Sequence, residues 1–144
     1  MTIAILGDAG GQLAYYLAQC AGSAEYVLLM PQEGQCYDVL LAAPGVRQAP
    51  RCATQALVAH DLDAAALAGQ VQAGAVITYG TEKSTLCLSS AADSCLVALQ
   101  REVVTCQGQT MGIGELRLPG TGLSGEQVCG VAGALAACGW PGLP

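Results

Sequence analysis

The chain has 144 residues, a length that fits one domain with a sizeable hydrophobic core. Hydrophobic residues make up 53% of it and charged residues only 11%, with 19 glycines and no phenylalanine, so small side chains are expected to pack closely. The net charge is -6, and the five basic residues form no cluster. Nucleic acid and an anionic membrane surface are therefore excluded as expected partners, because both require a cationic surface.

Eight cysteines raise the question of disulfides or a zinc site. No two of them form a Cys-x-x-Cys pair, which metal sites commonly use, and most lie inside apolar runs. We expect them to be free and buried, like small hydrophobic residues, and we predict no metal site. No basic region followed by a long apolar run begins the chain, which favours the reducing cytoplasm over secretion. The cysteines are Cys20, Cys36, Cys52, Cys87, Cys95, Cys106, Cys129 and Cys138.

The first twenty residues have the pattern of a buried strand that leads into a helix. Residues 2–6 are a short apolar run, and glycines follow it. Such a loop lets the backbone approach a ligand, and the free N–H groups at the start of the following helix favour an anion. The candidate cofactor-binding residues of this loop are Gly7, Asp8, Gly10, Gly11 and Gln12.

The side chains of a nucleotide site are missing from this loop. A P-loop requires Lys followed by Ser or Thr after its last glycine, but Gly11 and Gln12 stand at those positions. The only lysine of the chain is Lys83. The glycine spacing also differs from a dinucleotide-binding fingerprint. The loop residues therefore do not support ATP or another nucleotide, and no cofactor is predicted.

Strand and helix patterns alternate up to Gly80. Short apolar runs predict strands over residues 25–30, 37–43, 55–60 and 74–80. Helices are predicted over residues 11–21 and 64–72, the second with Asp61 or Asp63 as its N-cap, and a surface loop over residues 46–51. This order predicts an α/β fold with three layers, built on a Rossmann-like or P-loop-like, mostly parallel sheet.

The pattern changes after Gly80. Short segments that alternate apolar and polar residues predict an antiparallel meander over residues 85–90, 94–99, 102–106 and 115–118. A final helix is predicted over residues 126–139. The apolar run that contains it is broken at Pro141 and is too short for a membrane span, so we expect a buried helix or a helix in a subunit interface. Residues 1–144 are predicted to form one domain.

Polar residues at two predicted strand ends are further candidates. His60 is the only histidine and ends a predicted strand, at the edge where open α/β sheets bind ligands. Together with Asp61 and Asp63 it suggests a general base or a divalent metal site, although an aspartate that caps the next helix is the simpler interpretation. His60 is kept as a candidate cofactor-binding residue. Residues 81–84 are expected to form a solvated turn. Of the tyrosines at positions 15 and 16, we expect one to be buried and the other to be partly exposed.

The order of these parts resembles the central, ATP-binding domain of the Mur ligases, the amide-bond-forming enzymes of peptidoglycan precursor synthesis. The opening Ile5-Leu6-Gly7-Asp8-Ala9-Gly10-Gly11-Gln12-Leu13 lies where that family has Thr-Gly-Thr-x-Gly-Lys-Thr-Thr. Ala75-Val76-Ile77-Thr78-Tyr79-Gly80 is similar to the family's Val-x-Thr-Phe/Tyr-Gly segment. The tail from Gly125 to Pro141 is similar to its Gly-x-His-Asn-Val-x-Asn-Ala-Leu-Ala-Ala helix, which ends in Leu-Gly-Ile-Pro. The resemblance covers nearly the whole chain.

The departures from this family decide the functional prediction. The family residues that bind ATP phosphates and magnesium have no counterparts at Gly11 and Gln12, and Glu126-Gln127 replaces the His-Asn pair. The length leaves no room for the family's substrate-binding first domain, and the chain stops where its third domain would begin. No serine lies in a Gly-x-Ser-x-Gly elbow and no cysteine has a second histidine as partner, so nucleophilic hydrolysis has no support.

Two functional hypotheses follow. The first is a non-catalytic, stand-alone Mur-ligase-like domain that serves as a binding or interaction module, with a second copy of itself or another protein as partner. The second is a small enzyme or sensor that holds a nucleotide or phosphate ligand through backbone N–H groups of residues 7–11, with His60 near the reacting atom. We favour the first, so the chain is not expected to be an enzyme.

Overall fold

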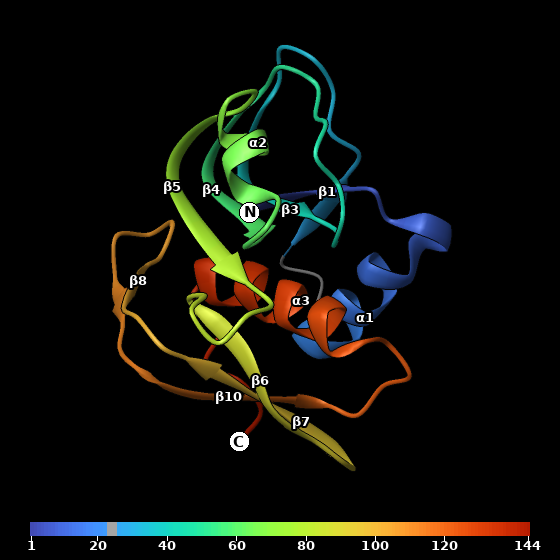
Figure 1. Ribbon diagram of the computed structural model, residues 1–144, viewed down its shortest axis with the longest axis vertical. Helices are drawn as coiled ribbons and strands as arrows, with labels where there is room; N and C mark the ends of the chain where they lie inside the picture. The colour runs from blue at the N-terminus through green and yellow to red at the C-terminus, as the bar shows by residue number, and fades with distance from the viewer. Residues whose placement is uncertain (23–25) are drawn as a thin grey trace.

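The computed structural model describes residues 1–22 and 26–144, and residue 25 of the predicted strand 25–30 lies outside them. Figure 1 shows the arrangement of the elements. In chain order they are β1 (Thr2–Leu6), the 3-10 turn η1 (Ala9–Gly11), α1 (Gln12–Ala21), β2 (Val27–Leu29), β3 (Cys36–Ala42), β4 (Ala53–His60), α2 (Ala64–Ala68), β5 (Gln72–Tyr79), β6 (Leu86–Ala91), β7 (Ser94–Leu99), β8 (Val103–Val104), β9 (Thr110–Met111), β10 (Gly114–Pro119) and α3 (Gly125–Ala137).

The described residues form one eight-stranded sheet in the order β10-β7-β6-β5-β4-β3-β1-β2. The strands from β1 to β6 run parallel to their neighbours, although β5 and β6 pair only through Tyr79 and Leu86. The last two pairings, of β6 with β7 and of β7 with β10, are antiparallel. The structure thus confirms the predicted α/β fold with a mostly parallel sheet and an antiparallel C-terminal part.

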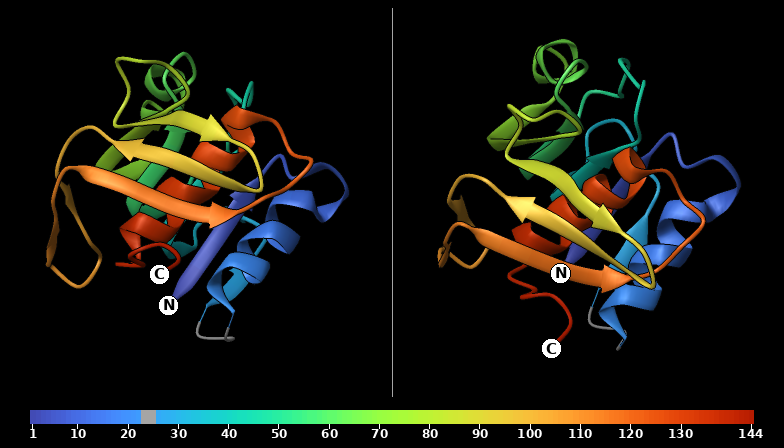
Figure 2. Two further views of the ribbon diagram at one scale, coloured as in Figure 1. Left: turned by 90° about the horizontal axis from the view of Figure 1, so that it is seen from below. Right: turned by 60° about the horizontal axis from the view of Figure 1, so that its bottom comes forward.

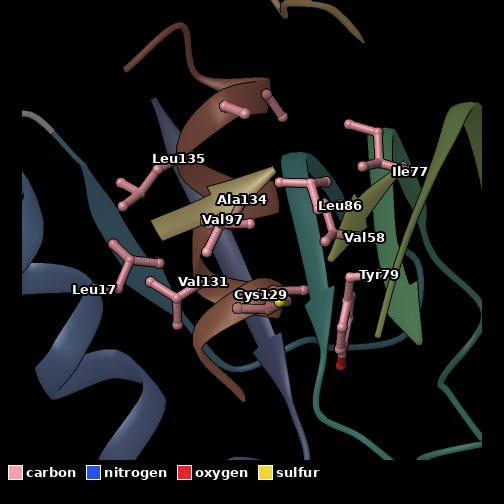
Figure 3. Packing of buried hydrophobic residues seen from close by; sticks show 14 of the residues in the cluster. Leu17, Val58, Ile77, Tyr79, Leu86, Val97, Cys129, Val131, Ala134 and Leu135 are labelled. Carbon is pink, nitrogen blue, oxygen red and sulfur yellow. The ribbon is translucent and has the colours of Figure 1, made fainter. Parts of the chain in front are cut away.

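Helix α3 lies at the centre of the larger core. All ten residues from Val128 to Ala137 are buried, as expected for a helix that is apolar on every side. The sheet curls around it, with β3, β4 and β5 on one side and β6 and β7 on the other (Figure 2). Side chains from α1, β4, β6 and β7 point toward α3, among them Leu17, Val58, Leu86 and Val97 (Figure 3). The final helix is therefore buried in the protein's own core, as predicted.

The opposite face of the parallel strands has a smaller core. It contains Leu40 of β3 and Leu57 of β4, which α2 covers with Ala64 and Leu67. Helices on both faces of the sheet give the three layers that were predicted. Within the described residues, no helix is both long and apolar enough to cross a membrane.

Two predicted elements differ from the structure. The helix predicted over residues 64–72 ends at Ala68, because Gly69 caps it and Gln72 already pairs with Ala53 as the first residue of β5. The strand predicted over residues 102–106 is only Val103–Val104, and it pairs with β9 in a separate ribbon rather than with the meander. In both places pairing with another strand, rather than the local pattern, sets the boundary.

All eight cysteines are free. Cys20, Cys52, Cys95, Cys129 and Cys138 are buried, as predicted. Cys87 and Cys106 are half-buried, and Cys36 is exposed at the start of β3, so for these three the prediction of full burial is wrong. Burial raises the pKa of Cys20 to about 11 and the pKa of Cys129 and Cys138 to about 12.

Candidate functional site

The strand order creates a crevice at the carboxyl edge of the sheet. Strand β1 lies between β2 and β3, so the chain leaves β1 toward one end of the sheet and leaves β3 toward the other. Open α/β sheets bind ligands at such a switch point, because the diverging loops leave a gap there. The crevice has a volume of about 430 Å³ and lies between the loop after β1, the loop after β3 and the start of α3. Its lining includes Gly7, Asp8, Gln12, Pro44, Ser124 and Gln127.

Glycines shape the loop after β1. Gly7 has a φ of +77° and Gly10 a φ of +70°, conformations that side chains other than glycine rarely adopt. A Cβ at Gly7 would also collide with Val46 in the loop after β3. The amide of Ala43 donates to the carbonyl of Leu6 (2.9 Å) and holds the two loops together.

The carboxylate of Asp8 occupies the start of α1. Its Oδ1 accepts a hydrogen bond from the amide of Leu13 (2.8 Å), and its Oδ2 accepts one from the amide of Ala14 (3.0 Å). These amides belong to the first turn of the helix, where an anionic ligand would otherwise bind. A phosphate that used these amides would have to displace a carboxylate of the same charge sign. Three clefts surround this loop: the crevice, a groove along α1, and a third cleft that extends toward Leu28 and Met30. In the described part of the chain, no Lys or Arg lines any of them.

His60 ends β4 and is buried, with 5% of its surface exposed. Its Nδ1 accepts a hydrogen bond from the amide of Leu62 (3.1 Å), so this nitrogen carries no proton. Its Nε2 contacts the carboxylate of Glu126 at the start of α3. The ring also meets the ring of Tyr79 edge to face, with the centroids 5.6 Å apart. Nδ1 is therefore occupied within the protein, and Nε2 is buried against the Glu126 carboxylate with no hydrogen-bond partner among the described residues.

Tyr79 ends β5 and forms the wall between His60 and the core. It is fully buried, and its hydroxyl donates to the carbonyl of Ala42 (2.6 Å). Burial, reinforced by the negative charge of Asp63, raises its pKa. The phenol thus remains a neutral hydrogen-bond donor that ties β5 to the end of β3.

The two aspartates after His60 have separate structural roles. Asp63 is the N-cap residue of α2, as predicted, but its side chain makes no capping hydrogen bond. Its carboxylate instead accepts from the amide of Gly45 (2.7 Å) and from Nε of Arg47 (2.9 Å), fixing the loop after β3. The carboxylate of Asp61 accepts from the hydroxyl of Thr81 (3.3 Å). Among residues 1–22 and 26–144, no group of three or more His, Cys, Asp or Glu could hold a metal ion.

The turn after β5 is only partly solvated. Glu82 and Lys83 are exposed, as predicted, but Ser84 is fully buried. The Ser84 hydroxyl accepts from the amide of Thr81 (3.1 Å). A hydrogen bond to a hydroxyl group within the turn therefore stabilises its conformation.

The structure brings the loop candidates together but places His60 apart from them. Gly7, Asp8 and Gln12 line the switch-point crevice, and Gly10 and Gly11 line an adjoining groove beside α1. His60 lines none of the clefts around the loop, because β3 separates β4 from β1. Comparisons with protein-family models, with curated proteins and with solved structures give no match to the chain.

Sequence reasoning missed the groove beside α1. It has a volume of about 630 Å³, and its walls include Tyr15 and Gln19 of α1 and Thr121 and Leu123 of the segment before α3. The spacing of Gln12, Tyr15 and Gln19 was the available signal, because residues three, four and seven apart share one face of a helix. Tyr15 is 76% exposed and Tyr16 is buried, which confirms the prediction for this pair.

Proposed function

We propose that this chain is a non-catalytic binding module with a Mur-ligase-like order of parts, and that its binding surface lies at the carboxyl edge around the loop after β1. The Asp8 carboxylate on the amides of Leu13 and Ala14 is the observation that carries this proposal. It fills the position at which a P-loop holds phosphate.

Two further observations support a role without catalysis. Gly11 and Gln12 stand where a P-loop has its lysine and hydroxyl residue, and they supply neither positive charge nor a magnesium ligand. Nδ1 of His60 is occupied by the amide of Leu62, and its buried Nε2 lies against the Glu126 carboxylate. The partner of such a module is a second copy of the chain or another protein, and its proposed compartment is the cytoplasm.

The switch-point crevice favours a second candidate function. Its position at the divergence of β1 and β3, next to glycines without side chains, suits a small ligand held by backbone groups. On this alternative the chain is an enzyme or sensor that binds a nucleotide or another phosphate ligand through residues 7–11. Asp8 would then have to leave the helix start before the ligand could bind.

A thermal-shift experiment separates the two functions. The purified protein is titrated with ATP, ADP, NAD, UDP-sugars and inorganic phosphate, each with and without magnesium. A ligand that binds the native state raises the melting temperature by mass action, so even modest affinity is detected. We expect no shift and no ATP turnover.

The variant Gly10→Asp serves as the control for the loop. It adds bulk and negative charge at a residue with a φ of +70°, where nothing lies within 4 Å of the position that a Cβ would occupy. A nucleotide shift in the wild type that this variant abolishes would overturn the proposal and establish the enzyme or sensor alternative.

A further inference from the structure

A groove runs between α1 and the segment that joins β10 to α3. The hydroxyl of Tyr16 on α1 donates to the carbonyl of Pro119 at the end of β10 (2.6 Å), which fixes the two walls relative to each other. The capping box of α3, in which Ser124 and Gln127 exchange hydrogen bonds, holds the far end of the second wall. The volume of about 630 Å³ falls in the range of about 300–1,000 Å³ that small-molecule sites occupy.

The lining of this groove combines polar and apolar surface and carries no charged side chain. Three glutamines contribute to it, Gln12 and Gln19 from α1 and Gln127 from α3, together with the hydroxyl of Thr121. A neutral lining is notable because the chain has a net charge of -6 and the adjoining crevice contains Asp8. The groove therefore offers hydrogen bonds without attracting or repelling an ion.

Several of these polar groups are available to a ligand. Oε1 of Gln127 accepts from the amide of Ser124 (3.0 Å), which leaves the NH2 group of Gln127 as a donor. Among the described residues, the side chains of Gln12 and Gln19 have no hydrogen-bond partner, and each offers both a donor and an acceptor. The ring of Tyr15 stands beside them with 76% of its surface exposed.

From this lining we infer that the groove binds a neutral sugar, an inference that rests on the proposed binding function. Sugar hydroxyls donate and accept hydrogen bonds, which matches side-chain amides that do the same. The C–H face of a pyranose ring is apolar and fits against an exposed aromatic ring that also carries a polar hydroxyl. A groove with amides, a hydroxyl and one open tyrosine ring supplies both kinds of contact.

The same lining argues against other ligand classes. A phosphate ligand needs cationic or free amide groups, and the groove has no lysine or arginine, while the Asp8 carboxylate takes the amides of Leu13 and Ala14. A purely apolar ligand would leave the glutamine amides without partners. Extended peptides are commonly bound at a strand edge, and the walls here are a helix and a loop.

An NMR titration of the intact, nitrogen-labelled chain tests the inference, because it follows the side-chain amide signals directly. The chain contains no asparagine, so every side-chain amide signal belongs to a glutamine. The probes are maltotriose, cellotriose and N,N'-diacetylchitobiose, each added to millimolar concentration. We expect at least one of them to shift the amide signals of Gln12, Gln19 and Gln127 in a saturable manner.

Three variants provide the specificity control. Tyr15→Ala and Gln19→Ala are expected to weaken sugar binding about tenfold or more, while circular dichroism and the melting temperature show an intact fold. Gln48→Ala, an exposed glutamine in the loop after β3, is expected to bind as the wild type does. The absence of saturable shifts with all three sugars, or binding that Tyr15→Ala leaves unchanged, would overturn the inference.

A tripeptide without charged ends, N-acetyl-trialanine amide, is titrated in parallel. Saturable binding of the peptide but of no sugar would also overturn the inference and would assign the groove to a protein partner. Failure of the inference can be told apart from failure of the proposed function, because the proposed function is overturned by a different result, a loop after β1 that binds or turns over a nucleotide.

Discussion

Asp8 determines what the loop after β1 offers to a ligand. Its two carboxylate oxygens bond the amides of Leu13 and Ala14, so the negative charge also complements the positive end of the α1 dipole. An internal carboxylate at a helix start stabilises the helix and at the same time keeps external anions away. The loop therefore retains the glycines of a nucleotide site while its anion position is filled from within.

The Asp8→Ala variant tests this capping role. Loss of the carboxylate leaves two helix-start amides without their partner, and we expect the free energy of unfolding to fall by about 1 kcal/mol. Urea denaturation followed by circular dichroism measures the change. Asp93→Ala, at an exposed position between β6 and β7, is the matched control and should be close to neutral. Equal stability of the two variants would show that Asp8 contributes nothing as a cap.

The sequence predicted the glycine loop after β1 but not the hydrogen bonds that its side chains make. The glycines and the helix that follows were visible as a pattern, because backbone conformation and periodicity are local properties. The direction of the Asp8 side chain and the engagement of His60 by Glu126 depend on contacts with other parts of the chain. His60 and the loop both lie at the carboxyl edge of the sheet, because β1, β3 and β4 are parallel, but the strand order places β3 between them.

Helix α3 depends on glycine for its close approach to the sheet. A Cβ added to Gly133 would lie 2.8 Å from Cγ1 of Val58 and 3.4 Å from Cδ1 of Leu86. At Gly130 it would lie 3.1 Å from Cζ of Tyr79. The sheet can curl around α3 because these positions carry no side chain.

Substitution of Gly133 tests this packing. Alanine has the higher helix propensity, by about 1 kcal/mol, but the clash with β4 should exceed this gain. We expect Gly133→Ala to lower the free energy of unfolding by about 1–3 kcal/mol, the usual cost of overpacking, and Gly133→Val to cost more. Chemical denaturation measures both. In Gly69→Ala at the end of α2 the new Cβ would make only ordinary contacts, at 3.6 Å from the Ala66 carbonyl oxygen, so this control should be near neutral. A stabilised Gly133→Ala variant would contradict the packing argument.

Element boundaries were predictable where the hydrophobic pattern alone sets them. Strands β1, β3, β4 and β7 and the final helix follow apolar runs that stop at glycine, proline or polar residues. The early end of α2 and the short β8 were not predictable, because Gln72 pairs with Ala53 of β4 and Val103 pairs with Met111 of β9 rather than with the meander. Local patterns carry no information about such partners.

At the scale of the whole molecule, buried thiols and phenols that are uncharged in the fold determine how stability depends on pH. The thiols of Cys20, Cys129 and Cys138 and the phenols of Tyr16 and Tyr79 are all buried, and burial raises the pKa of each. In the unfolded chain the thiols ionise near their ordinary pKa of 9.0. Between the unfolded and folded pKa values, only the unfolded state therefore loses these protons.

Stability should consequently fall as the solution becomes alkaline. Below about pH 8 the thiols are protonated in both states and contribute no pH dependence, whereas from about pH 9 upward each buried thiol should lower the free energy of unfolding by about 1.4 kcal/mol per pH unit. Urea denaturation under reducing conditions, repeated from about pH 7 to about pH 10.5, measures the slope. Cys138→Ala should make the slope shallower, because it removes one of these groups, while Cys36→Ser should leave the slope unchanged, because that thiol is exposed in the folded protein. A free energy of unfolding that stays constant to about pH 10.5 would mean that the buried thiols ionise as easily in the fold as in the unfolded chain, and that the core around α3 admits water.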